Sequence, residues 1–145
     1  MAFLDDPQRR FLASARSATL ATIAPDGRPR LVPVCFVLMD GDASHIWFAL
    51  DEKPKAVADP RELARVRDIE RDPRVTLLVE RWSEDWAELA WLRCDGRAEL
   101  IEPGGDEDAV RALRAKYPQY ATHALEQRPL VRIAVERARS WGHLG

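Results

Sequence analysis

Two lysines lie close together in the middle of the chain, just before an expected helix start, and this arrangement suits the binding of a phosphate. Lys53 and Lys55 flank a proline directly after a short apolar run, and Arg61 follows shortly afterwards. Asp59-Pro60-Arg61-Glu62 has the pattern of a helix start with a capping aspartate and a proline at the first helical position. A helix N-terminus beside cations offers both backbone donors and positive charge to an anion. A solvated charged loop is the alternative interpretation.

The other residues that could do chemistry do not form a known catalytic pattern. His45, His123 and His143 are too dispersed for a metal-binding or hydrolytic motif, and we expect each to be at the surface or partly packed. The chain has no Walker phosphate loop and no GxGxxG motif, and Glu84 and Asp85 indicate a solvated turn. No catalytic residue is therefore assigned, and we expect a bound cofactor to supply any difficult chemistry.

Length and composition predict one domain over residues 1–145. The chain is long enough for a single hydrophobic core, and its formal net charge of -2 gives no general basis for binding nucleic acid. Cys35 and Cys94 are far apart and form no zinc-ligand pattern, as expected of reduced thiols in the cytoplasm. We find no signal peptide and no apolar run that would cross a membrane. The expectation is a cytoplasmic protein with neither a nucleic-acid nor a membrane partner.

Short apolar runs separated by turn signals predict a mainly β fold with peripheral α-helices. Strands are expected at 18–23, 31–39, 46–50, 75–79, 87–101 and 130–135. The run 87–101 is either one strand or a pair bent around Asp95-Gly96. Helices are expected to start at Asp6, Asp59 and Asp106. Because most strands follow their neighbours closely in sequence, we expect a six-stranded antiparallel barrel.

One proline is placed unusually within this pattern. Pro33 lies inside the expected strand 31–39, where it cannot donate a hydrogen bond to a β-ladder. It therefore indicates an edge strand, a β-bulge, or a backbone segment that faces a ligand instead of a neighbouring strand.

A series of motifs follows in a fixed order along nearly the whole chain. They are Leu20-Ala-Thr-Ile-Ala-Pro-Asp-Gly-Arg-Pro, Val32-Pro-Val-Cys-Phe, Trp47-Phe-Ala-Leu, Lys53-Pro-Lys55, Leu63-Ala-Arg-Val-Arg-Asp-Ile-Glu-Arg-Asp-Pro-Arg-Val and Asp95-Gly-Arg-Ala. In this order they resemble the flavin- and deazaflavin-binding split β-barrels related to pyridoxamine 5′-phosphate oxidase. The Lys-Pro-Lys turn and Ser83-Glu-Asp-Trp86 are most similar to the subgroup that uses the deazaflavin coenzyme F420. The resemblance implies a homodimeric split β-barrel with the cofactor in a groove at the subunit interface.

The resemblance also implies which residues contact the cofactor ring. The residues whose backbone would face the ring are Val32, Pro33 and Val34. Those that would line the groove along the third strand are Phe48, Ala49 and Leu50. Trp141 resembles a C-terminal aromatic residue that packs near the cofactor of its own or the partner subunit. The alternative interpretations are that Phe48 belongs to the core and that Trp141 only anchors the C-terminal segment.

The cations have corresponding implied roles. Lys55 aligns with the phosphate-binding lysine of the family, and Arg65 would be a second cation on the following helix, with a solvated helix residue as the alternative interpretation. Lys53 and Arg61 would help to hold a longer anionic tail. Asp68 departs from the asparagine that is common in the subgroup, and we expect it to place an anion close to these cations.

We therefore expect an oxidoreductase that binds coenzyme F420 and transfers a hydride between the deazaflavin and a small organic substrate. An FMN-dependent enzyme of the same fold is one alternative, and a non-catalytic flavin-, deazaflavin- or tetrapyrrole-binding protein is another. The final residues, Trp141-Gly-His-Leu-Gly145, lack the Arg/His substrate motif of true pyridoxamine phosphate oxidases, so we do not expect that reaction. Trp82, Trp86 and Trp91 would fill a substrate pocket, the core or the dimer interface.

Overall fold

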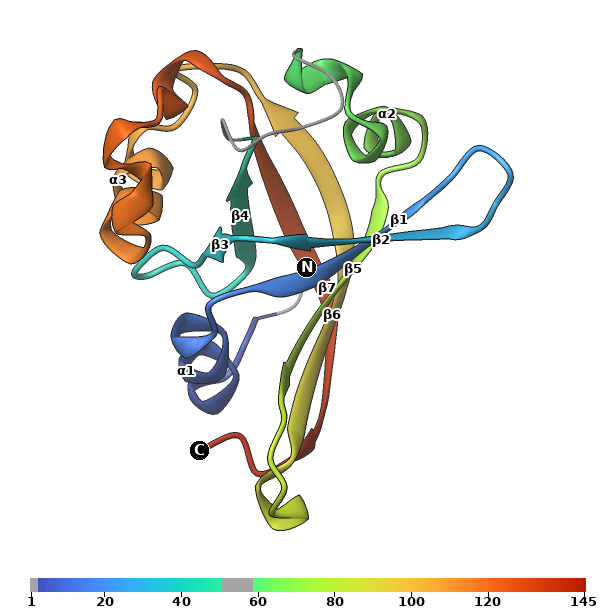
Figure 1. Ribbon diagram of the computed structural model, residues 1–145, viewed down its shortest axis with the longest axis vertical. Coiled ribbons are helices and arrows are strands. Elements are labelled where there is room, and N and C mark those ends of the chain that lie inside the picture. The colour runs from blue at the N-terminus through green and yellow to red at the C-terminus, as the bar shows by residue number, and fades with distance from the viewer. Residues whose placement is uncertain (1–2, 51–58) are drawn as a thin grey trace.

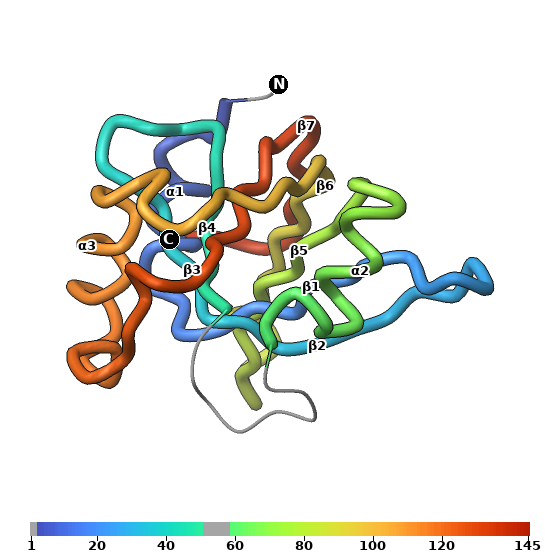
Figure 2. Tube along the Cα trace, turned by 90° about the horizontal axis from the view of Figure 1, so that it is seen from above, coloured from blue at the N-terminus to red at the C-terminus, as the bar shows by residue number. Residues whose placement is uncertain are grey.

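In several of the strands, buried side chains alternate with more exposed ones, as expected for half-buried β-structure. The computed structural model describes residues 3–50 and 59–145 (Figures 1 and 2). Its strands are β1 (Ala18–Ile23), β2 (Pro29–Val34), β3 (Phe36–Val37), β4 (His45–Ala49), β5 (Arg74–Arg81), β6 (Ala90–Ile101) and β7 (Leu130–Gly142). Its α-helices are α1 (Asp6–Ser14), α2 (Ala64–Arg71) and α3 (Glu107–Lys116). Short 3-10 turns are η1 (Pro60–Glu62), η2 (Trp86–Glu88), η3 (Pro118–Thr122) and η4 (Leu125–Gln127).

The strands form one antiparallel sheet in the order β2-β1-β5-β6-β7-β4-β3. β2 and β3 stand at opposite ends of this order, although only Cys35 separates them in the chain. The sheet must therefore curl until its two ends meet, and Figure 1 shows β2 running on into β3 across the front of the molecule. This confirms the predicted split barrel. The run 31–39 forms two strands instead of one, so the described residues contain seven strands where six were predicted.

The two longest strands connect the barrel to a projecting part of the sheet. β7 continues to Gly142, well beyond the predicted end at 135, because it pairs with β6 along almost its full length. A β-bulge at Asp95/Gly96 interrupts this pairing, and a Cβ atom on Gly96 would collide with the Ala134 carbonyl oxygen. Beyond the bulge, β5, β6 and β7 form what we call the arm, residues 79–92 and 139–142, which extends below the barrel in Figure 1.

Two hydrophobic clusters account for the continuous apolar run in β4. Phe48 and Leu50 are buried in the barrel interior, the larger cluster, which also receives side chains from α1 and α2. Trp47 and Ala49 point the other way, into a second cluster closed by α3. β4 is thus covered on both faces, which explains why its sequence does not alternate. Figures 1 and 2 place α2 beside the β1–β2 hairpin and α3 beside β3 and β4.

The helix starts follow the predicted capping residues, with one correction. Asp106 accepts a hydrogen bond from the Ala109 backbone N–H at the start of α3, as its position predicts. Asp59 does not begin a longer helix: its carboxylate accepts from the Arg61 N–H, which closes the 3-10 turn η1, and α2 begins only at Ala64. The predicted helix start at Asp59 is therefore wrong by about one turn. Among the described residues, no helix is long and apolar enough to cross a membrane.

Candidate cofactor-binding site

The edge strand β2 presents the backbone segment that the sequence assigns to the cofactor ring. Pro33 pairs with Thr19 of β1, and within the described strands β2 has a ladder partner on this side only. The edge-strand interpretation of Pro33 is therefore confirmed. Val34 is buried and Val32 is half-buried, whereas Pro33 and Leu31 face outward, with Leu31 65% exposed. The outer edge of β2 is thus a backbone surface that a ligand can approach.

The groove residues predicted on the third strand are packed differently from one another. Phe48 and Leu50 have no exposed surface, and their side chains fill the barrel interior. Ala49 packs toward α3 in the second cluster. The interpretation of Phe48 as a core residue therefore holds for its side chain. Any contact of Phe48 or Leu50 with a cofactor would be made by backbone atoms, and that contact stays a prediction.

The predicted cations are only partly described. Lys53 and Lys55 lie outside the described residues. Arg61 is exposed and donates from both terminal nitrogens to Glu102, with N–O distances of 3.2 and 2.6 Å. These hydrogen bonds and the Glu102 charge raise the pKa of Arg61. Arg65 is half-buried on α2. Arg61 would therefore have to exchange Glu102 for a cofactor anion, while Arg65 keeps its predicted place on the helix.

Asp68 is the centre of a buried ionic network that sequence reasoning did not find. Its carboxylate accepts from Thr22 Oγ1 at 2.7 Å, from Arg30 Nε at 2.7 Å and from Arg71 Nη2 at 3.0 Å. Burial acts to raise the pKa of Asp68, but the hydrogen bonds from Arg30, Thr22 and Arg71 outweigh it, so the pKa is lowered. The expected anion is present, but it is paired with two guanidinium groups. The partners in β1 and β2 are too distant in sequence for any local pattern to reveal them.

Trp141 is separated from the predicted groove residue Ala49 by nearly the whole length of β7. It is 53% exposed and sits near the end of β7, whose first residue, Leu130, pairs with Ala49. The strand between Leu130 and Trp141 spans about 35 Å at roughly 3.3 Å per residue. The predicted placement of Trp141 beside the cofactor of its own or the partner subunit stays a prediction.

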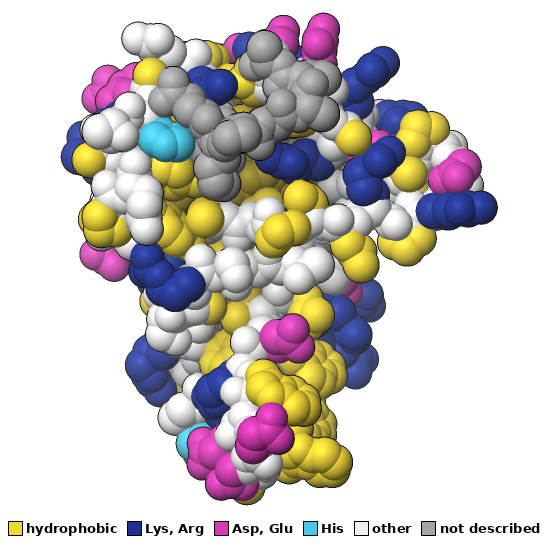
Figure 3. All heavy atoms as spheres, viewed as in Figure 1, with side chains coloured by type: hydrophobic (Ala, Val, Ile, Leu, Met, Phe, Trp, Pro, Cys, Tyr) yellow, Lys and Arg dark blue, Asp and Glu magenta, His cyan; other side chains and the backbone are white. Residues whose placement is uncertain are grey.

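The arm carries a shallow tryptophan-rich hollow of about 330 Å³. Trp91 and Trp141 are cross-strand neighbours in the β6–β7 ladder, and Trp82 completes the aromatic lining. Trp82 and Trp86 are 68% and 72% exposed, so the interpretation that they fill the core is wrong. Figure 3 shows hydrophobic side chains gathered along one side of this lower part of the molecule. An apolar surface of this kind marks an interaction site more often than plain solvent exposure.

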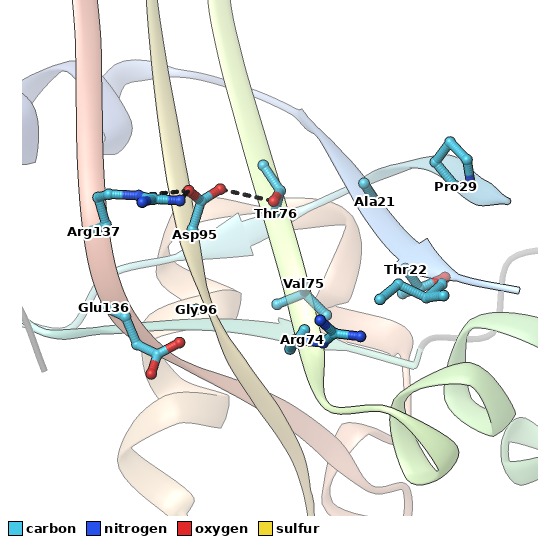
Figure 4. Close-up of a pocket in the computed structure, with 11 residues that line it drawn as sticks. Ala21, Thr22, Pro29, Arg74, Val75, Thr76, Asp95, Gly96, Glu136 and Arg137 are labelled. Carbon is cyan, nitrogen blue, oxygen red and sulfur yellow. Dashed lines mark hydrogen bonds and ion pairs between the residues drawn. The ribbon is translucent and has the colours of Figure 1, made fainter. Parts of the chain in front are cut away.

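A second hollow, of about 420 Å³, lies on the outward sheet face over β1, β5, β6 and β7. At its centre Asp95 accepts from Thr76 Oγ1 at 2.8 Å and from Arg137 Nη2 at 2.7 Å, as Figure 4 shows. At its rim Arg74 binds Asp72, with Nη2 and Oδ2 2.7 Å apart. The charged groups Asp95, Arg137 and Arg74 at this hollow are thus paired with neighbouring side chains. In the described part of the chain, no group of three His, Cys, Asp or Glu side chains could hold a metal ion.

Comparisons with solved structures give the same fold. A conserved hypothetical protein from Mycobacterium tuberculosis is 27% identical, with a TM-score of 0.76, over 99% of this chain and 87% of that chain. A heme binding protein from Mycobacterium smegmatis is 23% identical, with a TM-score of 0.71, over 97% of this chain and 54% of that chain. A protein from Listeria innocua, assigned only provisionally as a pyridoxamine 5′-phosphate oxidase, is 19% identical, with a TM-score of 0.62, over 90% of this chain and 92% of that chain.

The family model described as pyridoxamine 5′-phosphate oxidase matches residues 4–142, which include all seven strands and all three α-helices of the described structure. The chain therefore belongs to the pyridoxamine 5′-phosphate oxidase family.

Proposed function

We propose that this protein is an oxidoreductase that binds a flavin-type cofactor, with the deazaflavin F420 as the form favoured by its motifs. The observation that carries the proposal is the edge strand β2, whose outer backbone edge and exposed Leu31 and Pro33 are available to a planar ring. Membership of a family that typically binds flavin supports it. FMN is the alternative cofactor for the same site.

The residues of this chain would bind and orient the cofactor, which itself supplies the hydride chemistry when bound. The backbone of Val32, Pro33 and Val34 would fix the position of the ring, and Arg65 would attract its anionic end. The buried side chains of Phe48 and Leu50 anchor the end of β4 from inside the barrel. Such fixed placement contributes to rate by orienting the reactants.

We also propose that the functional unit is a homodimer that forms through the arm and the outward face of the sheet. The separation of Trp141 from Ala49 along β7 supports this, because a second copy would supply its own Trp141 to the site. The exposed acids Glu80, Glu84, Asp85 and Glu88 lie at the end of the arm, and the exposed arginines Arg93, Arg137 and Arg139 lie nearer the barrel. In a two-fold arrangement with antiparallel arms, the acidic end of one copy would face the arginines of the other.

A second candidate function is the binding of a tetrapyrrole without turnover. It is favoured by the similarity in fold to the heme binding protein from Mycobacterium smegmatis, although this chain covers only 54% of that protein. The two functions differ in the redox turnover of the bound ligand. A catalytic cofactor is reduced and reoxidised when a hydride donor and an acceptor are added. A tetrapyrrole that is bound without turnover would leave both the hydride donor and the acceptor unconsumed.

The test is a parallel titration of the purified protein with F420, FMN and heme, followed by fluorescence or absorbance. We expect F420 or FMN to bind with micromolar or lower Kd. Lys55→Ala should weaken this binding on the order of 10- to 100-fold, because it removes a charge-assisted contact to the phosphate. Arg111→Ala, an exposed change on α3, is the matched control and should leave Kd unchanged. Binding of heme alone would overturn the proposal, and an unchanged Kd in Lys55→Ala would remove that lysine from the site.

A further inference from the structure

Tyr117, the C-cap residue of α3, has a hydroxyl that joins three separate parts of the chain. Its side chain belongs to the second hydrophobic cluster, and the residue is only 5% exposed. The hydroxyl accepts from the Phe36 backbone N–H at 3.1 Å, and it lies 3.0 Å from the Arg16 carbonyl oxygen and 3.1 Å from that of Phe36. Its single proton can be donated to one of these two oxygens at a time. Burial raises the pKa of Tyr117, so the proton is retained at neutral pH.

These contacts lie at the point where the β1–β2 ladder stops. Ala18 and Val34 form the last pair of that ladder, and the same register would bring Arg16 opposite Phe36. In a continuous ladder the Phe36 N–H would then face the Arg16 carbonyl oxygen. The Tyr117 hydroxyl lies between these two groups, because it accepts from the first and can donate to the second. It therefore replaces a direct hydrogen bond at the place where β2 ends and the chain crosses to β3.

The ring of Tyr117 is contacted from several sides, which fixes the position of its hydroxyl. The Arg16 guanidinium lies over this ring, 4.8 Å from its centre, and donates to the Lys116 carbonyl oxygen at 2.9 Å. Tyr120 makes an edge contact, with the two ring centres 5.6 Å apart. The backbone N–H of Tyr117 donates to the Leu113 carbonyl oxygen at 2.9 Å. The end of α3, which lies beside β3 in Figures 1 and 2, thus holds the hydroxyl against the crossing from β2 to β3.

We infer that Tyr117 is a positioning residue for the proposed cofactor site, because its hydroxyl determines where the C-terminal end of β2 lies. The inference rests on the proposed function and deepens it. The segment proposed to face the ring, residues 32–34, ends two residues before Phe36. Within the described strands β2 has a ladder partner on one side only, so the hydrogen bonds at its end contribute to fixing its position. Tyr117 itself would not touch the cofactor.

Tyr117→Phe tests this inference, because phenylalanine keeps the ring and its packing and removes only the hydroxyl. The probes are F420 and FMN, each titrated into the wild type and the variant. We expect the Kd of the cofactor that binds more tightly to rise at least about fivefold, because an unsatisfied Phe36 N–H loosens the end of β2. The absorbance and fluorescence maxima of the bound ring should also shift at saturation, because the backbone that faces the ring has moved.

Val110→Ala is the matched control for a loss of packing under α3. Val110 is buried in the same cluster as Tyr117, so its truncation should lower Tm without removing a hydrogen bond at the β2–β3 crossing. We expect a higher Kd and a shifted ring spectrum in Tyr117→Phe alone. A purely structural role of Tyr117 predicts that both variants lose stability and that both keep the wild-type Kd and ring spectrum. That result would overturn the inference.

Amide hydrogen exchange of the wild type keeps the test decisive if Tyr117→Phe does not fold. Coupling between two sites is reciprocal, so a cofactor whose binding depends on this hydroxyl must stabilise the hydrogen bond from the Phe36 N–H in return. We expect the Phe36 amide to exchange more slowly at saturating cofactor, and an unchanged exchange rate would rule the inference out. If the wild type binds neither F420 nor FMN, the proposed function itself fails and this inference falls with it.

Discussion

At the scale of single residues, Lys116 is a side chain whose positive charge is disfavoured by its partly buried surroundings. Its Nζ lies 3.9 Å from the centre of the Phe36 ring, near the end of α3. Burial, together with the nearby charge of Arg16, lowers its pKa from 10.5 to about 8. The charged form therefore opposes folding at neutral pH. The packing of α3 against the barrel therefore includes an unfavourable free energy for keeping Lys116 charged.

We expect Lys116→Met to raise Tm at pH 7, by about 2–4 °C for each kcal/mol gained, because methionine keeps the packing on Phe36 without the charge. Between pH 8 and 10.5 the unfolded wild-type chain binds more protons at this lysine than the folded chain, so wild-type stability rises with pH. The advantage of the variant should therefore shrink across that range. Arg111→Met, exposed on the same helix, is the control. A constant difference from pH 7 to 10.5 would contradict the assignment.

At the scale of elements, the β-bulge in β6 sets how the barrel passes into the arm. Gly96 is buried, and an added Cβ would meet the backbone of Ala134 in β7. Backbone atoms cannot move away as a flexible side chain can. Gly96→Ala should therefore cost about 2 kcal/mol or more and lower Tm, as measured by thermal unfolding.

Gly27→Asn is the informative comparison for this prediction. Gly27 has a φ of 87°, but a Cβ added there would meet no atom within 4 Å, and asparagine tolerates this left-handed conformation better than most residues. The variant should lose much less stability than Gly96→Ala. Equal losses would show that close approach to β7 does not explain the glycine at 96.

The arm is the element through which the proposed homodimer would form. Trp82 and Trp86 are too exposed to stabilise a single chain by burial, so the double variant Trp82→Ser and Trp86→Ser should keep its Tm as a monomer. It should, however, shift the protein from dimer to monomer in sedimentation velocity at micromolar concentration. Phe3→Ser, which removes a side chain that is 78% exposed but distant in sequence from the arm, should leave the dimer intact. A double variant that still dimerises would exclude the arm as the interface.

At the scale of the whole molecule, sequence patterns predict the local elements better than their long-range pairing. The alternating and apolar runs locate most of the strands, and Pro33 indicates an edge strand, because these features depend on local periodicity and on the missing donor of proline. The extension of β7 to Gly142 could not be predicted, since residues 136–142 are mostly polar and become a strand through pairing with β6. The sequence does not reveal the break between β2 and β3 at Cys35, because the residues around it form one continuous apolar run.

In the candidate site, too, sequence patterns predict the local elements but not the long-range contacts between them. The sequence places Val32–Val34 on a strand and Arg65 on a helix, and resemblance to the family supplies their roles. The pairing of Asp68 with Arg30 and Thr22 joins positions 38 and 46 residues apart, which no spacing rule can detect. The separation of Trp141 from Ala49 also emerges only from the strand register.

The measurement that tests the central claim most directly is sedimentation velocity of the protein with bound cofactor, recorded at the absorbance of the protein and of the ring together. A flavin-type cofactor held between two copies should sediment with the protein at about twice the chain mass of 16.5 kDa, with no cofactor on any monomer peak. Cofactor that sediments with a 16.5 kDa monomer, or that stays behind as free ligand at concentrations far above micromolar, would contradict the account.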